Sequence, residues 1–317
     1  MQTNILGYPR IGDKRELKKA NELYWSGKIS LDELLEVAAK LKTKNWTLQK
    51  EAGVDLIPSN DFSFYDQVLD MSFTLGAIPE RYSALAENES VNELDVYFAA
   101  ARGYQKNGHD IIAMEMTKWF DTNYHYIVPE FYKNQQFKLQ SQKVFSEYTE
   151  AKAQGIQTKP VLIGPISYLL LGKEKEAGFE KLDLIDNLFP VYVEILKKLR
   201  DLGAVEIELD EPFLALDLNE KEQTAFRLVY QEFHRQIPEL KILLTTYFDG
   251  LKDNLPLALS LPVDILHVDL VRAPEQLDAL LETISPSAQL RLSLGLIDGR
   301  NIWKNNWKNH WKVLGKP

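Results

Sequence analysis

The sequence contains no cysteine. This absence excludes disulfide bonds, a thiolate nucleophile and any zinc site built on sulfur ligands. The sequence also lacks an apolar run near the ~20 residues that a membrane-spanning helix needs, and its first residues lack the apolar core of a secretory signal. We therefore expect a cytoplasmic protein that has no membrane partner.

Basic residues are in the minority, with 37 Lys and Arg against 46 Asp and Glu, which gives a formal net charge of −9. An acidic protein is poorly suited to nucleic acid as its main partner. Any anion site must therefore be a local basic pocket. The rest of the composition, 45% hydrophobic and 26% charged, is that of a globular protein with a substantial core.

Short apolar runs alternate with longer segments of helical periodicity along the chain. Strands are predicted at NILGYP (4–9), VDLIPS (54–59), IIAMEMT (111–117), KPVLIGP (159–165), AVEIELDEP (204–212), KILLTTYF (241–248), VDILHVDL (263–270) and LRLSLGLID (290–298). Strands that alternate with helices form parallel βαβ units, and eight of them favour one (β/α)8 TIM barrel as a single domain, residues 1–317. The helical segment 66–107 is then an insertion after the second strand.

Two local patterns make the expected fold more specific. SLDE, from Ser30 to Glu33, predicts a capping box that opens a helix. The first turn, GYPRIG, lacks the glycine spacing of a dinucleotide-binding open sheet, so the barrel is favoured over that alternative.

Acidic residues occupy every second position of AVEIELDEP. Period two places Glu206, Glu208 and Asp210 on one face and aliphatic side chains on the other. The aliphatic face should meet the helices, so the carboxylates should point into the barrel, with Arg291 as a candidate partner. Because chemistry in barrels sits at the carboxyl ends of strands, we interpret Glu206, Glu208 and Arg291 as a structural polar network.

The loop after the first predicted strand, RIGDKRELKK (10–19), is strongly basic. With Asp13 as N-cap and Glu16 at N3, Arg15 and Lys18 should share one helix face beside free backbone N–H groups. Such a helix start attracts carboxylates or phosphates. A solvated charged turn is the competing interpretation, and we favour the anion site because the turn faces the barrel mouth.

A second mouth segment, MTKWFDTNYHYIVPE (116–130), combines a cation with many aromatic residues. These aromatics follow neither a helical nor a strand period. They indicate a pocket wall for a flat ring, with Trp119 in it and Lys118 as an anion anchor. A loop packed over the barrel rim explains the aromatics equally well.

Carboxylates at other strand ends suggest a different chemistry. Asp210, Glu211 and Asp269 could supply the paired acids of a hydrolase, and Asp210 and Asp269 are also candidate pocket residues. A metal site made of His267, Asp269 and Asp210 is disfavoured, because such sites need several converging ligands and only one histidine is well placed. We expect no metal and no cofactor in this chain.

Several segments together resemble the N-terminal half of cobalamin-independent methionine synthase. The motifs are LGYPRIGDKRELKKANELYWSGKIS, MTKWFDTNYHYIVPEF, KPVLIGPISYLLLGK, ELDEPFLALDL, LLTTYFDG, LHVDLVRAPEQ and LGLIDGRNIWK. The similarity runs from about Asn4 to Trp303. It implies an enzyme of two face-to-face (β/α)8 barrels that moves a methyl group from 5-methyltetrahydropteroyl-polyglutamate to homocysteine, which gives methionine.

The resemblance also implies a role for this half. By motif match, Arg15, Glu16, Leu17 and Lys18 of RELK and Lys118 of MTKWF would hold the folate glutamate tail. The zinc ligands and the homocysteine pocket would belong to a C-terminal barrel that is absent here. We therefore expect the chain to hold no catalytic residue and to be inactive alone.

Two other functions stay open, namely a stand-alone barrel hydrolase and a non-catalytic barrel that docks on a C-terminal partner barrel. The final run, WKNNWKNHWKVLGKP, departs from the family pattern. Its tryptophans, Trp303, Trp307 and Trp311, recur every four residues and would form an exposed aromatic stripe on a helix. We expect the chain to be a fragment or a truncated product.

Overall fold

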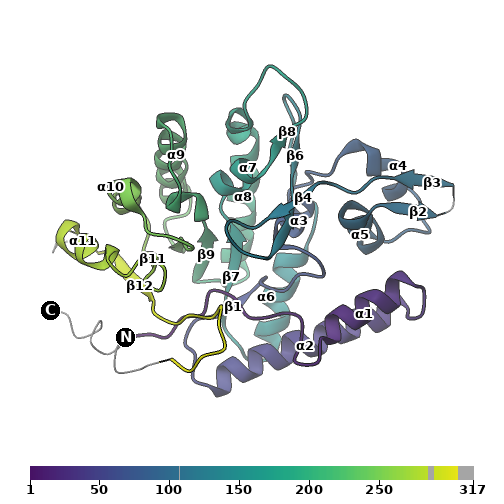
Figure 1. The fold of residues 1–317 in the computed structure, drawn as a ribbon, viewed down its shortest axis with the longest axis horizontal. Coiled ribbons are helices and arrows are strands. Elements are labelled where there is room, and N and C mark those ends of the chain that lie inside the picture. The colour runs from purple at the N-terminus through teal and green to yellow at the C-terminus, as the bar shows by residue number, and fades with distance from the viewer. Residues whose placement is uncertain (107, 285–288, 306–317) are drawn as a thin grey trace.

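A parallel six-stranded sheet, in the order β1-β7-β9-β10-β11-β12, curls through the centre of the molecule (Figure 1). The computed structural model describes residues 1–106, 108–284 and 289–305. The strands of the sheet are β1 (Ile57–Ser59), β7 (Thr158–Ile163), β9 (Glu206–Asp210), β10 (Lys241–Thr245), β11 (Ile265–Asp269) and β12 (Arg291–Gly295). The fold is therefore α/β with a curled parallel sheet, as the alternation of strands and helices predicted.

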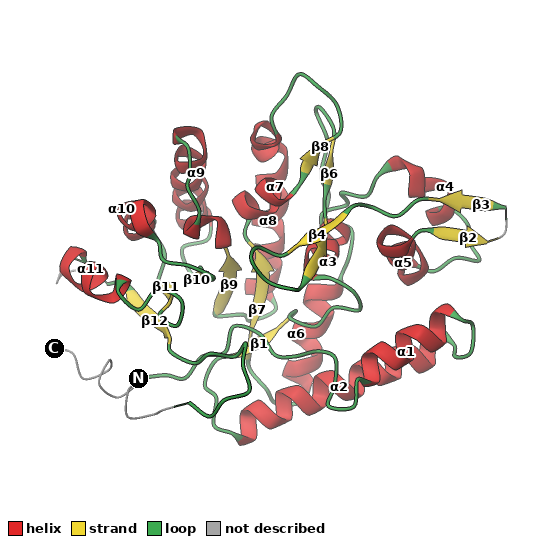
Figure 2. Cartoon of the chain, viewed as in Figure 1, coloured by secondary structure: helices red, strands yellow, loops and turns green. Residues whose placement is uncertain are grey.

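Helices flank this sheet, and α1 and α2 lie side by side along one edge of the molecule (Figure 2). The α-helices are α1 (Glu16–Trp25), α2 (Leu31–Glu51), α3 (Gln67–Thr74), α4 (Ser83–Ala86), α5 (Glu93–Arg102), α6 (Lys143–Ala153), α7 (Pro165–Leu171), α8 (Ile185–Asp201), α9 (Glu220–Gln236), α10 (Leu255–Ser260) and α11 (Gln276–Thr283). The 3-10 helices are η1 (Glu80–Tyr82), η2 (Lys181–Leu184), η3 (Pro212–Ala215) and η4 (Lys252–Asn254). No helix in the described part is long and apolar enough to cross a membrane.

Six of the eight predicted strands are confirmed in the sheet. The first predicted strand contributes only a parallel bridge between Asn4 and Leu56. The predicted strand at 111–117 is wrong, because this segment belongs to two antiparallel hairpins outside the sheet. The hairpin strands are β2 (Tyr104–Lys106) with β3 (His109–Ile111) and β4 (Met116–Lys118) with β5 (His125–Ile127).

The reason for this error is visible in the exposure of the segment. Ile112 is 73% exposed and Met116 is 52% exposed, whereas a strand inside a barrel wall would bury such side chains. A short apolar alternation fits a surface hairpin as well as a barrel strand. Long-range packing, and not this local pattern, therefore decides whether the segment forms a barrel strand or a surface hairpin.

The insertion after β1 is longer than the predicted helical segment 66–107. It continues through both hairpins and α6 before the chain re-enters the sheet at β7, and it includes β6 (Glu130–Phe131), which pairs with β8 (Lys173–Glu174). Helices α4 and α5 and the β2–β3 hairpin form a lobe far from β12 (Figure 1). An apolar cluster around Tyr82, Leu85 and Phe98 packs this lobe against α1, α2 and α3.

Helix α2 begins where the sequence predicted. The Ser30 hydroxyl accepts the backbone N–H of Glu33 at 3.2 Å, and the Glu33 carboxylate accepts the N–H of Ser30 at 2.7 Å. This capping box satisfies two of the free donors of the first helical turn. Trp303 is 77% exposed, whereas Trp307 and Trp311, the other members of the predicted stripe, lie outside the described residues.

The predicted polar network is present in part, because Arg291 pairs with Glu206 but is exposed and not inside the curled sheet. Arg291 lies 3.5 Å from the carboxylate of Glu206, which confirms this pair. Ile207 and Leu209 are buried against the helices, but Val205, predicted for the same face, is 57% exposed because it precedes the strand. From Glu206 onward, the alternation therefore predicts correctly which face of β9 each side chain occupies.

A buried ion pair between Lys159 and Glu208 lies deeper in this network, and the two side chains are 2% and 0% exposed. The Lys159 ammonium also donates to the carbonyl of Ile5 at 2.9 Å, so it ties the N-terminal segment to β7 and β9. Burial raises the pKa of Glu208, and the neighbouring ammonium acts against this shift. The pair is stable only because each charge has the other within contact distance.

We predict that Lys159→Met destabilises the fold by about 3–5 kcal/mol, because it leaves the Glu208 carboxylate buried without its cation. Urea unfolding followed by circular dichroism measures this change. The double variant Lys159→Met with Glu208→Gln should recover a large part of the loss. A single variant within 1 kcal/mol of the parent protein would show that the pair does not support the fold.

Candidate functional site

The basic turn before α1 is built differently from the prediction. Arg15 is the N-cap of the helix, with a left-handed backbone (φ 62°, ψ 39°) and no side-chain cap. The prediction that Asp13 caps the helix is wrong, because its carboxylate forms an ion pair with Lys44 of α2 that lowers the pKa of Asp13. Glu16, which was predicted at N3, is the first residue of α1, and its carboxylate accepts the backbone N–H of Lys14 at 2.9 Å. Its own backbone N–H and that of Lys14 lower the pKa of Glu16.

This local structure separates the two faces of α1. Leu17 is 1% exposed and packs in a cluster with Leu41 and Phe62, so its side chain orients the helix and faces away from solvent. Arg15 and Lys18 are on the exposed side. Lys18 has one weak ion pair, 3.7 Å from Glu22, with both side chains about half exposed. In the described part of the chain, Arg15 has no carboxylate within ion-pair distance.

The second predicted segment forms the β4–β5 hairpin, residues 116–127, which we call the mouth hairpin. Lys118 is exposed and pairs in register with His125 across the hairpin. Trp119 is 4% exposed, and its ring contacts Phe120 and Tyr126 edge-on. Trp119 therefore belongs to the main apolar core of the molecule and does not form an exposed pocket wall.

The tip of the mouth hairpin contacts the loops that follow β9, β10, β11 and β12. Phe120 packs against Phe213 and Phe248, with ring centroids 5.6 Å and 5.5 Å apart. Asp121 forms ion pairs with Arg272 at 3.1 Å and Arg300 at 3.7 Å. Figure 1 shows the loop between β4 and β5 reaching across toward β9. The hairpin therefore covers the carboxyl ends of these strands.

Glu211, a candidate acid of the hydrolase hypothesis, is fully buried and acts as a cap for α7. Its carboxylate accepts the backbone N–H of Ser167 at 2.7 Å and the hydroxyl of Tyr230 at 3.1 Å. Burial raises the pKa of Glu211 to about 7. A β-carbon on Gly164 would lie 2.1 Å from this carboxylate, so the strand-to-helix turn is shaped around it.

The other two acids of that hypothesis also have structural partners. Asp210 is buried and accepts the Tyr247 hydroxyl at 3.0 Å. Asp269 accepts the backbone N–H groups of Phe248 at 3.1 Å and Arg272 at 2.9 Å, and so shapes two loops. These acids lie among the strand ends that the mouth hairpin covers. All three acids of the hydrolase hypothesis, Asp210, Glu211 and Asp269, therefore make hydrogen bonds that support the fold.

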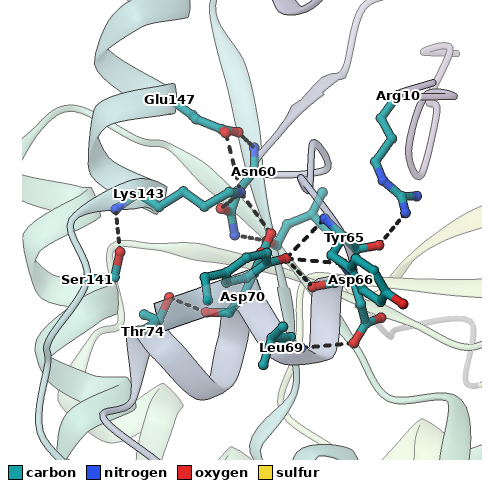
Figure 3. Close-up of polar contacts among 12 residues, drawn as sticks. Arg10, Asn60, Tyr65, Asp66, Leu69, Asp70, Thr74, Ser141, Lys143 and Glu147 are labelled. Atoms are coloured by element: carbon teal, nitrogen blue, oxygen red, sulfur yellow. Dashed lines mark hydrogen bonds and ion pairs between the residues drawn. The ribbon is translucent and has the colours of Figure 1, made fainter. Parts of the chain in front are cut away.

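One loop makes hydrogen bonds to both the basic turn and the mouth hairpin. This bridging loop, residues 60–66, follows β1 and leads into α3. The Arg10 guanidinium donates to the carbonyl of Tyr65 at 2.5 Å, as Figure 3 shows. The Asp66 carboxylate accepts the backbone N–H of Leu69 at 3.0 Å and that of Ile127 in β5, also at 3.0 Å. The loop thus holds one segment through Arg10 and the other through Asp66.

The start of the bridging loop is anchored by a largely buried ion network (Figure 3). The Lys143 ammonium lies 3.3 Å from the carboxylates of Asp70 and Glu147 and donates to the side chain of Asn60 at 2.9 Å. Asn60 in turn donates to the carbonyl of Val161 in β7 at 2.8 Å. The loop is therefore fixed to the sheet itself.

Sequence reasoning did not identify Asp66 or Lys143 as supports of the site. Asp66 did carry a readable signal, since it precedes a helical run and is the N-cap of α3. Lys143 carried none, because its partners come from distant segments. Burial raises the pKa of Asp66 to about 7.

Comparison with known proteins identifies related sequences over almost the whole chain. The profile of the family described as "Cobalamin-independent synthase, N-terminal domain" matches residues 2–316. A 5-methyltetrahydropteroyltriglutamate–homocysteine methyltransferase from Flavobacterium johnsoniae is 64% identical over 304 residues, which cover 96% of this chain and 39% of the relative. One of the same name from Saccharomyces cerevisiae is 50% identical, over 100% of this chain and 42% of the relative. The chain thus spans about two fifths of the length of these curated relatives.

Solved structures support the fold. A putative vitamin-B12 independent methionine synthase from Listeria monocytogenes matches with a TM-score of 0.63 at 15% identity, over 99% of this chain and 86% of that chain. At this low identity the match concerns the fold alone.

We predict that Gly12→Ala destabilises the basic turn more than Gly27→Ala. Both glycines have positive φ, 82° and 70°, so both variants carry the cost of a left-handed alanine, about 1–2 kcal/mol. Only at Gly12 would the new β-carbon also meet the Glu16 carboxylate, at 2.2 Å. Chemical unfolding of both variants measures the difference. Equal losses would show that the packing of Glu16 against Gly12 does not matter.

We predict that Asp66→Asn removes a pH dependence of stability. The pKa of Asp66 is raised to about 7 from its ordinary 3.8, so between these values the native state holds more protons than the unfolded state. The free energy of unfolding then falls as pH rises through this window. Relative to the parent protein, Asp66→Asn should gain about 4 kcal/mol between pH 4 and pH 7.

Urea unfolding at several pH values measures this difference. The exposed substitution Glu89→Gln is the control and should keep a constant offset from the parent protein. A constant offset for Asp66→Asn as well would contradict the raised pKa.

Proposed function

The chain belongs to the cobalamin-independent methionine synthase family, as a counterpart of its N-terminal domain, and we propose that it binds the glutamate tail of 5-methyltetrahydropteroyl-polyglutamate during methyl transfer to homocysteine. The curated relatives are named for a triglutamate folate and homocysteine. The observation that carries the proposal is that exposed cations, Arg15, Lys18 and Lys118, lie on two segments held by one bridging loop.

The chemistry of the tail fits this arrangement. A polyglutamate carries a carboxylate on every residue, and each charge-assisted contact to Lys or Arg contributes on the order of 1.5–3 kcal/mol. The internal structure of the turn leaves these cations available, because Glu16 is held by the backbone of Lys14 and Asp13 by Lys44. The site is a local basic patch on a protein of net charge −9.

The catalytic chemistry is proposed to lie outside this chain. Methyl transfer to a thiol benefits from a metal that holds the thiolate. The chain has no cysteine, and its described residues contain no group of three or more His, Asp or Glu side chains placed to hold a metal ion. We assign the zinc and homocysteine sites to a second barrel, which is the partner of this domain. By this proposal the chain is inactive alone and acts in the cytoplasm.

We also propose that the N-terminal segment closes the curled sheet into a barrel of the (β/α)8 type as one domain over residues 1–317, with seven strand positions because residues 111–117 lie outside the sheet. The N-terminal segment supports it, because it reaches both edges of the curled sheet. Asn4 bridges to Leu56 beside β1, and its side-chain amide donates to Ser293 of β12 at 3.2 Å. Arg291 of β12 donates to Gln2 at 3.4 Å. By this proposal the segment takes one further strand position, between β1 and β12.

The proposal predicts that affinity depends on tail length. By isothermal titration, 5-methyltetrahydropteroyl-triglutamate should bind this chain more tightly than the monoglutamate. Lys18→Ala and Lys118→Ala should each weaken triglutamate binding roughly 10-fold, since each loses a charge-assisted contact. Lys241→Ala is the matched control, because this exposed lysine lies at the opposite end of β10 from the mouth.

Equal binding of the two folates, with no effect of Lys18→Ala or Lys118→Ala, would contradict the tail site. If the chain then still bound a separately produced second barrel, the docking function would be selected instead. We do not propose the hydrolase, because its three acids serve the scaffold and the relatives give it no support.

A further inference from the structure

The two cation-bearing segments meet at one pair of side chains. The Arg10 guanidinium donates to the Tyr124 hydroxyl at 3.2 Å and lies over the Tyr124 ring, 5.4 Å from its centroid. Among the described residues, this hydrogen bond and this cation–π contact are the polar and aromatic interactions that directly join residues 7–25 to the mouth hairpin. Arg10 is five residues before Arg15, and Tyr124 is the neighbour of His125, which faces Lys118.

Tyr124 is fixed from the hairpin side as well. Its carbonyl accepts the backbone N–H of Trp119 at 2.7 Å, which closes the hairpin turn beside Lys118. Its hydroxyl lies 3.3 Å from the Asp66 carboxylate, to which it donates. Burial raises the pKa of Tyr124, so the hydroxyl keeps its proton and can accept from Arg10 while it donates to Asp66.

We propose that Tyr124 is a positioning residue which, through Arg10, fixes the spacing between the cations of α1 and Lys118 and so sets the preference for long glutamate tails. This inference rests on the proposed function. In this proposal, a monoglutamate tail contacts the cations of one segment only. In this proposal, a triglutamate tail contacts both segments, and its second contact is more favourable when the distance between the segments is fixed before the ligand binds. Tyr124 itself is not required to touch the ligand.

The test is the ratio of the monoglutamate dissociation constant to the triglutamate dissociation constant, measured by titration of the full chain. Tyr124→Phe keeps the ring over Arg10 but removes the hydroxyl. It should lower the ratio roughly threefold to tenfold, as expected for one lost hydrogen bond, and leave monoglutamate affinity within about twofold. A purely structural defect would weaken both ligands alike.

Tyr126→Phe is the matched control. Tyr126 lies in the same hairpin, is 7% exposed, and donates its hydroxyl to the carbonyl of Leu171, away from Arg10. It loses a buried hydrogen bond of the same kind but should keep the parent ratio. If both tyrosine variants lower the ratio equally, or if Tyr124→Phe keeps the parent ratio within about twofold, the inference is overturned.

A second variant guards against loss of folding in Tyr124→Phe. Arg10→Lys keeps the charge but loses the planar group that reaches both Tyr65 and Tyr124. It should lower the ratio similarly, and the double variant should be no worse than either single one, because both act through one contact. Additive effects would overturn the inference. A parent ratio near one would overturn the proposed function, and this inference with it, whereas a normal parent ratio that persists in both variants overturns the inference alone.

Discussion

The bridging loop is the constraint on which the candidate site depends. At its start, Asn60 is hydrogen-bonded to β7 and to the partly buried Lys143 ammonium, so the loop is attached to the sheet. At its end, the carbonyl of Tyr65 holds Arg10 and the carboxylate of Asp66 holds the backbone of β5. The two segments that carry the exposed cations are thereby both hydrogen-bonded to one loop, which is itself attached to the sheet. Without this loop, the cations would be ordinary surface charges, each of little value to a ligand.

The mouth of the curled sheet explains why this domain binds and does not catalyse in our account. Open barrel mouths hold active sites in the loops after their strands. Here the mouth hairpin lies over those loops, with Phe120 among aromatic neighbours and Asp121 between two arginines. The carboxylates near the strand ends cap a helix or shape a loop. In our proposal, the exposed cations at the rim hold a long flexible anion while the reacting end of the folate extends to a partner barrel.

Local patterns in the sequence predicted local structure well. The Ser30–Glu33 capping box was confirmed because both of its hydrogen bonds lie within four residues. The pairing of Glu206 with Arg291 was also confirmed, because period two fixes which face of a strand each residue occupies. The same reasoning failed at residues 111–117, where a short alternation fits a surface hairpin equally well.

Contacts between distant segments could not be read in the same way. Asp13 was expected to cap α1, but it pairs with Lys44, 31 residues away. Lys159 and Glu208 are 49 residues apart, and Arg10 and Tyr124 are 114 apart. In each of these three pairs, the sequence around the two residues gives no sign of the contact. The candidate cations were therefore predictable from motif and charge, whereas the loop that holds them required the three-dimensional structure.

The most direct measurement of the central claim is a crystal structure of this chain with 5-methyltetrahydropteroyl-triglutamate. Our account predicts one tail whose carboxylates lie within hydrogen-bond distance of both Lys18 and Lys118, beside an unchanged Arg10–Tyr124 contact. A tail that contacts the cations of only one segment, or that binds elsewhere on the molecule, would contradict the account.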